Sequence, residues 1–352
     1  MPKRSDEHCG CMVRAREWRA YGLLCLVMVL AVTAGCESRD RTARQVVVYC
    51  SVDQQTAEPI LAEFQRQTGI RVLARFDTEA SKTVGLVQKI RAEAARPAAD
   101  VFWSGEIFYT IRLAAEGLLA EYTGASASAW PAAFRDVQGR WYGLALRGRV
   151  IGYSTDRVRP DEAPRCLEDL LDPRWKGRMV MADPDRGTTG GDVASWFVEF
   201  GSQRATEILR ALKTNGMRVV EGNSTAVRMV ATGQADVCLT DTDDVYAMQR
   251  NGAAVAMNPL RRNGRGTLAI PNTAAILRGA PHPQEAAALM EFLLGGPAEE
   301  MLLASDSHNW PVGRPAGPQQ EQYAITEPVE VDYVKVAEAL AAAKQTAREA
   351  LR

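Results

Sequence analysis

The densest group of chemically capable side chains is a run of acidic and hydroxyl residues, Thr-Asp-Thr-Asp-Asp, at positions 240–244. Three carboxylates within five residues repel one another unless a cation, hydrogen-bond donors or water compensate their charge. Hard cations take oxygen ligands of this kind. The run is therefore predicted to be either part of a cation site or a solvated loop.

Further polar side chains occur at comparable places along the chain, each time shortly after an apolar run. Their hydroxyl, amide and carboxylate groups suit a polar ligand, but Ser, Thr, Asp and Asn are also the preferred N-cap residues of helices. Capping alone would explain Thr78, Thr188 or Ser224, so both interpretations remain open. The predicted ligand-binding residues of this group are Ser51, Asp53, Thr78, Ser104, Glu106, Thr188, Thr189, Asn223, Ser224 and Thr225.

The apolar runs have the length of strands, and amphipathic segments with helical spacing follow them. One predicted helix starts at Pro59, because proline suits a first helical turn, and another starts at Val193 after a glycine-rich loop over 183–192. Strands that alternate with helices predict an α/β protein with mostly parallel sheets. The predicted strands span residues 46–49, 71–76, 99–103, 178–181, 218–220 and 235–239.

A strand-rich segment over 139–155 interrupts this alternation and divides the repeating units into two sets. We therefore expect two lobes joined by this crossing. In open α/β sheets, ligands bind beyond the carboxyl ends of the strands, beside helix N-termini. The polar residues of both lobes should then face one cleft. The expected boundaries are 46–146 with 260–315 for lobe 1, 147–259 for lobe 2 and 316–352 for a C-terminal helical segment.

Signatures of catalysis are missing from the sequence, which contains no GxxxxGK[ST], HExxH or GxSxG motif. Only three histidines are present, which leaves little material for general-base catalysis by histidine. Lys and Arg number 42 against 43 Asp and Glu, and this balance argues against a strongly basic nucleic-acid binder. These observations argue against an enzyme and against a nucleic-acid partner, and no cofactor is expected.

The N-terminal 35 residues have the pattern of an export signal: a basic start, then an apolar run over 21–35 that is short for a membrane span. Ala34-Gly35-Cys36 resembles a bacterial lipobox and predicts lipidation at Cys36, although Thr33 stands where leucine is usual. A plain secretory signal is the alternative. Residues 36–45 would form a tether, and the protein would lie outside the cytoplasm on a lipid anchor. Cys50, Cys166 and Cys238 lack CxxC spacing, which favours free thiols over a metal site, with one disulfide still open.

Several segments in order resemble the periplasmic solute-binding proteins of ABC importers, in particular the branch that binds ferric iron. The resemblance covers roughly residues 45–350 and implies a bilobal, type II binding-protein fold whose cleft closes on a ligand. The segments that carry it include VVVYCSVDQQTAEPILAEFQRQTGI, PAADVFWSGE, IRLAAEGLL, DLLDPRWKGR, EGNSTAVRMVATGQAD and PHPQEAAALMEFLL.

This resemblance implies a ligand set but also shows a departure from the family pattern. The ferric branch holds iron through a residue that falls near Asp53, a glutamate that falls at Glu106 and two tyrosines that fall at about Thr242-Asp243, so the tyrosines are missing. The family's anion-handling arginine matches Arg147 or Arg149. A hard cation such as Fe(III) would suit an all-oxygen metal set, with Arg147 holding a synergistic anion. That set is Asp53, Glu106, Asp241 and Asp243.

The same positions also suit a second kind of ligand, a small organic anion or phosphoester held by the hydroxyl groups and helix N-termini. An enzyme or a sensor subunit built on this fold remains a further alternative. For the transport hypothesis, the resemblance implies a permease and an ATPase as partners and a monomeric binding protein.

Overall fold

The computed structural model describes residues 44–352, except 79–80, 263 and 326. The predicted export signal, the lipidation site Cys36 and nearly all of the tether lie outside the described residues. Within the described part of the chain, no helix has the length and apolar character that a membrane crossing needs.

The first half of the fold consists of three strand–helix units. Their strands are β1 (Gln45–Cys50), β2 (Arg71–Phe76) and β3 (Val101–Ser104), and β1 pairs in parallel with the other two. The helices that follow them are α2 (Gln54–Thr68), α3 (Val84–Ala92) and α4 (Phe108–Ala115).

The second half repeats this arrangement with β5 (Met179–Ala182), β6 (Arg218–Val220) and β7 (Val237–Asp241), where β5 pairs in parallel with both others. The helices after these strands begin at the carboxyl end of the sheet, as they do in the first half. They are α6 (Gly187–Thr214), α7 (Asn223–Ala231) and α8 (Thr242–Arg250), and β8 (Val255–Pro259) follows.

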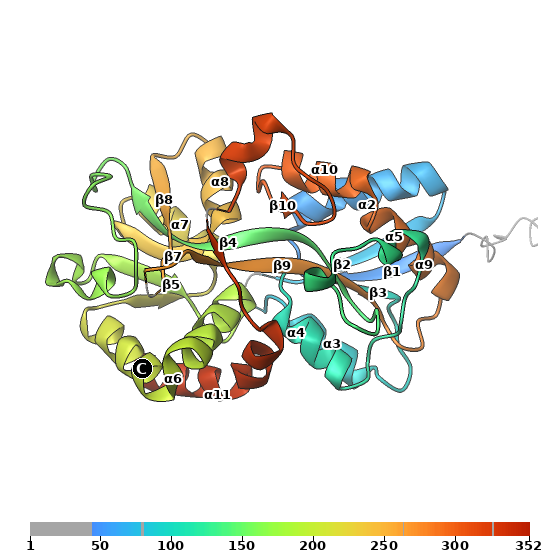
Figure 1. Cartoon of the computed structure of the whole chain (residues 1–352), viewed down its shortest axis with the longest axis horizontal. Coiled ribbons are helices and arrows are strands. Elements are labelled where there is room, and N and C mark those ends of the chain that lie inside the picture. Colours follow the sequence, from blue (N-terminus) through green and yellow to red (C-terminus); the bar gives the residue numbers. More distant parts are fainter. Residues whose placement is uncertain (1–43, 79–80, 263, 326) are drawn as a thin grey trace, which may run out of the picture. The chain divides into compact units, whose positions relative to one another are not determined.

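Two long strands join the halves: β4 (Tyr142–Ser154) and β9 (Thr267–Ile276) run antiparallel to each other through the middle of the sheet (Figure 1). The strand order is β2-β1-β3-β9-β4-β7-β5-β6. β4 pairs with β9 up to Gly148 and with β7 from Arg149, so its middle lies where one half gives way to the other.

The chain ends in helices α9 (Pro283–Leu293), α10 (Gly296–Ala304) and α11 (Tyr333–Leu351), with the short strands β10 (Trp310–Pro311) and β11 (Pro328–Val329) between α10 and α11. One short helix, α5 (Ala125–Ser128), precedes β4. α11 lies against both α4 and α6 (Figure 1). Its Lys344 Nζ donates to the Tyr109 hydroxyl at 2.7 Å and to the carbonyl of Asp185, so the last helix ties the two halves together.

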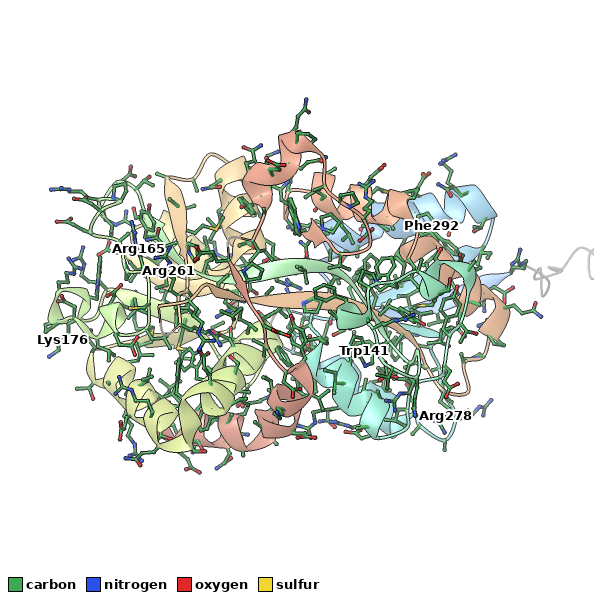
Figure 2. All side chains as sticks on the ribbon, viewed as in Figure 1. Trp141, Arg165, Lys176, Arg261, Arg278 and Phe292 are labelled. Atoms are coloured by element: carbon green, nitrogen blue, oxygen red, sulfur yellow. The ribbon has the colours of Figure 1, made fainter. Side chains whose placement is uncertain are left out.

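Buried apolar side chains fill the space between the sheet and the helices of each half. In the first half, Phe64 on α2 and Phe292 on α9 meet with ring centroids 5.5 Å apart, and Phe292 is labelled in Figure 2. In the second half, Trp196 on α6 and Met181 on β5 belong to the same buried cluster. Burial of this apolar surface drives the halves to fold around the sheet.

The predicted fold class is confirmed: the chain is an α/β protein with the type II binding-protein fold. The parallel pairing predicted from the repeating units is found at β1–β3 and β5–β7, whereas β4, β8 and β9 pair antiparallel. The predicted lobe boundaries remain a prediction.

Two predicted helix starts are wrong. α2 begins at Gln54, five residues before Pro59, so the proline lies inside the helix and only one backbone hydrogen bond is lost there. α6 begins at Gly187 inside the predicted glycine-rich loop. Gly191 is needed for packing, since a Cβ there would lie 1.9 Å from the Phe108 ring of α4. The glycines therefore allow a close helix–helix approach and do not mark a loop.

Candidate functional site

A small cavity lies between the two halves, at the carboxyl ends of β1, β3, β5 and β7. Its volume is about 30 Å³, room for one or two water-sized groups. Both halves contribute polar side chains to its wall. Seven of the predicted site residues line it: Asp53, Glu106, Arg147, Thr188, Thr189, Asn223 and Asp241. We call it the cleft cavity.

Two further predicted residues, Ser224 and Asp243, line a wider groove of about 540 Å³ instead. This groove adjoins the cleft cavity, because Asp53 and Asp244 belong to the walls of both. The acidic run thus lies where the cavity meets the groove. It is not a loop: Asp241 ends β7 and Thr242 begins α8.

The other predicted residues lie outside both walls. Ser51 and Ser104 are buried and bind backbone amides, those of Gly105 and Glu106, so they shape the turn after β3. Thr78 is exposed and bonds Ser81, while the Thr225 hydroxyl donates to Glu221.

The capping interpretation is wrong for the three residues to which it was applied. The N-cap positions of α3, α6 and α7 are Thr83, Arg186 and Gly222, so Thr78, Thr188 and Ser224 cap none of these helices. The side chains of these cap residues make no capping hydrogen bond within the described structure. The first residues of α6 and α7 line the cleft cavity, and a helix N-terminus favours negative charge.

A hydrogen-bonded cluster joins these two helix N-termini. Asp241 Oδ2 accepts from the Thr188 hydroxyl and from Asn223 Nδ2 at 2.9 Å. The Thr189 hydroxyl in turn donates to Asn223 Oδ1 at 3.0 Å. These contacts fix the first turns of α6 and α7 beside each other. We call Thr188, Thr189 and Asn223 the anion cradle.

Carboxylates crowd together directly beside the anion cradle. Oxygens of Asp241, Asp243 and Asp244 lie within 4.8 Å of one another, close enough to share a metal ion. Burial raises the pKa of Asp243 to about 6. Arg147 opposes this rise, and the charge of nearby Asp241 contributes to it. Burial and the charge of Asp243 also raise the pKa of Asp244 well above its usual range. Asp243 and Asp244 therefore tend to keep protons, and Arg147 and Arg149 pair with Asp243 and Asp241.

Arg147 lies in the middle of the site and bridges the two halves. Its Nη1 donates to Asp243 Oδ2 at 2.5 Å, and its Nη2 donates to the Gly105 carbonyl. Its Nε is buried and has no hydrogen-bond partner among the described residues. The Nε–H group can therefore donate one more hydrogen bond, to an anionic group at the cavity wall.

Two charged groups of the first half complete the site. Burial opposes ionisation of Asp53, but the adjacent Lys82 ammonium outweighs it and holds the pKa of Asp53 below its usual range. Glu106 accepts the amides of Phe108 at 2.7 Å and Tyr109 at 3.2 Å. Burial outweighs these bonds and raises the pKa of Glu106 to about 7.

Sequence reasoning missed several residues of the cavity wall. Lys82 and Thr83 follow β2 in the segment where Thr78 was predicted instead, and Arg186 and Glu221 lie two residues before the predicted Thr188 and Asn223. A backbone signal exists only in the structure: Thr83 has a φ of 66°, rare for a β-branched residue and typical of functional sites. The charge of Lys82, Arg186 and Glu221 was the available sequence signal.

The missing tyrosine pair is not replaced from nearby. Tyr246, one turn into α8, packs edge-on against His308 and Tyr323. Among the residues that the structure describes, no tyrosine lines the cleft cavity. The three described cysteines are free thiols, and Cys50 and Cys238 are buried.

The raised pKa values give a testable pH dependence of stability. In the folded, ligand-free protein, Asp243 and Glu106 keep protons between about pH 4 and 7 that the unfolded chain releases. The free energy of unfolding should therefore fall as pH rises through this window. We expect the Tm of metal-free protein to be higher at pH 5.5 than at pH 7.5, and the difference to shrink in Asp243→Asn and in Glu106→Gln. A Tm that rises with pH in the wild type, with unchanged slopes in both variants, would contradict these assignments.

The fold and this two-sided cleft define a ligand-binding protein of the bilobal class, and sequence comparison agrees. The model of the bacterial extracellular solute-binding protein family matches residues 96–335. The chain belongs to this family. Its members bind solutes, which confirms the prediction that the protein is not an enzyme.

Individual relatives share about a quarter of the sequence. Iron uptake protein A1 of Synechocystis sp. is 28% identical over 282 residues, which are 76% of this chain and 76% of the relative. The Fe(3+)-binding periplasmic protein of Serratia marcescens is 26% identical and covers 83% of this chain and 85% of its own. Iron-bound HitA from Pseudomonas aeruginosa has a similar structure, with a TM-score of 0.79, 27% identity and coverage of 87% of this chain and 99% of its own.

Proposed function

We propose that the protein is the extracytoplasmic solute-binding component of an ABC importer and captures ferric iron together with a small anion. The observation that carries this proposal is the meeting of carboxylates with helix N-termini at one site. The cleft cavity is lined by Asp53, Glu106, Asp241 and Asp244 together with Arg147 and the first residues of α6 and α7, and Asp243 lies in the adjoining groove. An ion and its counter-anion bound side by side would satisfy both.

The cation would lie against Asp243 and Asp244, with Asp53 and Glu106 facing it from the first half. Carboxylate oxygens are suitable ligands for a hard, highly charged ion. Attraction between the cation and the carboxylates would release the protons that burial and neighbouring carboxylates keep on Asp243 and Asp244. Iron is here the cargo and not a resident cofactor, in keeping with the iron-named relatives.

The anion would lie in the anion cradle, where Thr188, Thr189 and Asn223 begin α6 and α7. The side-chain donors of the cradle already bind Asp241 and one another, so the positive ends of the two helices would favour a phosphate- or carbonate-sized group there. Arg147 Nε would add a charge-assisted hydrogen bond from the side of the cation. The anion would thereby replace the ligand charge that tyrosines supply in the ferric branch.

The rest of the transport role follows from the same proposal. The export signal and Cys36 would place the chain outside the cytoplasm on a lipid anchor, and the loaded protein would deliver its ligand to a permease driven by an ATPase. Closure would bring the wall at Asp53, Glu106 and Lys82 against the wall at α6–α8. We expect it to act as a monomer with the lobe boundaries at 46–146 with 260–315 and at 147–259.

A second candidate ligand is a small organic phosphoester or phosphonate with its own cationic or hydroxyl group. Three basic side chains favour it: Lys82, Arg147 and Arg186 line the cleft cavity, where they oppose a bare cation. The phosphoryl group would occupy the anion cradle, and the carboxylates would bind the rest. The 30 Å³ cavity is too small for such a molecule unless the halves separate or the ligand extends into the wider groove.

Calorimetric titration distinguishes the two candidates. Metal-free protein is titrated with Fe(III) held in solution by citrate, in the presence and absence of phosphate, and separately with phosphoethanolamine. The proposal predicts one ferric ion per chain and tighter binding with phosphate. Absence of iron binding together with stoichiometric binding of phosphoethanolamine would favour the second candidate.

A further inference from the structure

Asp241 differs from its acidic neighbours in which groups its oxygens bind. Oδ1 accepts from Arg149 Nη1 at 2.7 Å, and Oδ2 accepts from Thr188 and Asn223. Asp243, by contrast, bonds Arg147 and the amide of Asp244 and makes no contact with the anion cradle. The two carboxylates are therefore suited to different tasks.

Asp241 is the first member of a buried series of side chains with alternating charges. Arg149 also pairs with Asp192, with 3.0 Å between Arg149 Nε and Asp192 Oδ2, and Asp192 binds Arg262. These four side chains are at most 1% exposed. They come from β7, β4, α6 and the segment between β8 and β9, so they fix the end of β7 against α6 from inside the second half.

We propose that Asp241 is a positioning residue, which holds Thr188 and Asn223 in place for the anion, and that Arg149 keeps it oriented. Asp241 then acts through the anion cradle. From the sequence, it was instead predicted to be among the ligands of the cation. This inference rests on the proposed function, in which an anion binds at the N-termini of α6 and α7.

The two roles predict opposite signs for one substitution. A carboxylate close to an anion repels it, so loss of that charge should strengthen anion binding if Asp241 has no other role. If Asp241 positions the cradle, its loss should weaken anion binding, because Thr188 and Asn223 lose the acceptor that orients them. The sign of the change therefore distinguishes positioning from simple electrostatics.

The experiment measures the affinity of metal-free protein for inorganic phosphate by calorimetry. We expect Asp241→Asn to bind phosphate roughly tenfold more weakly, the equivalent of one charge-assisted hydrogen bond. The matched control is Asp306→Asn, which removes the same charge from an exposed aspartate outside the walls of the cavity and the groove and should bind phosphate as the wild type does. Equal or tighter phosphate binding by Asp241→Asn would overturn the inference.

A second measurement needs no ligand. Amide hydrogen exchange at residues 187–190 and 223–225 should become faster in Asp241→Asn than in the wild type and stay unchanged in Asp306→Asn. Unchanged exchange at both helix starts would also overturn the inference. Thr188→Val, which removes one of the bonds and keeps the charge, should show the same change on α6 even if Asp241→Asn fails to fold. Wild-type protein that binds no phosphate would contradict the proposed anion, whereas exchange still decides the role of Asp241.

Discussion

Replacement of Arg149 by methionine is expected to lower the free energy of unfolding by about 3–5 kcal/mol. Arg149 is fully buried between Asp241 and Asp192, and a neutral side chain would leave Asp241 without its cationic partner. An uncompensated buried charge is among the most costly defects in a folded chain. Urea unfolding followed by tryptophan fluorescence measures the loss.

The control for this variant is Arg159→Met, which breaks an ion pair with Asp161 that is exposed on both sides. Exposed pairs contribute about 0–1 kcal/mol, so the control should unfold almost as the wild type does. A loss below about 1 kcal/mol in Arg149→Met, similar to the control, would show that the buried chain of charges does not stabilise the second half.

The second large effect is expected for iron. Asp243→Ala should weaken ferric binding roughly 100-fold or more, because truncation of one member of a buried charge pair costs about 2–5 kcal/mol. The substitution removes an anionic oxygen from the proposed cation site. It also leaves the Arg147 guanidinium without its 2.5 Å partner and facing the ion. Competition with citrate for Fe(III), followed by absorbance, measures the change.

Asp306→Ala is the matched control, because Asp306 is an exposed aspartate outside the walls of both the cavity and the groove. It should bind iron as the wild type does. Unchanged iron affinity in Asp243→Ala would show that the ion binds elsewhere and would contradict the proposed role of Asp243 and its acidic neighbours.

The fold was largely predictable because its signals are local. Strand-length apolar runs followed by helical spacing located β1–β3 and β5–β7 to within a few residues. The antiparallel pairing of β4 with β9 was not predictable, since these strands are more than 100 residues apart and no local pattern names a partner. The start of α6 was missed because Gly191 is required by the Phe108 ring, a contact between distant segments.

The site was predictable in its location but not in its bonding. The position of polar residues after strands predicted Asp53, Glu106 and Asp241, and the family resemblance predicted Arg147; all four line one cavity. Which acid pairs with which arginine depends on three-dimensional geometry: Arg147 meets Asp243, and Arg149 meets Asp241. The sequence pattern predicted the same metal-binding role for Asp241 and Asp243. Their different hydrogen bonds are the basis for proposing a positioning role for Asp241 and a cation-binding role for Asp243.

The most direct test of the central claim is native mass spectrometry, with elemental analysis, of the protein purified from the extracytoplasmic compartment of its own cell. The account predicts one iron per chain, with the mass of a small inorganic anion beside it. A stoichiometric phosphorylated organic molecule without metal would contradict it.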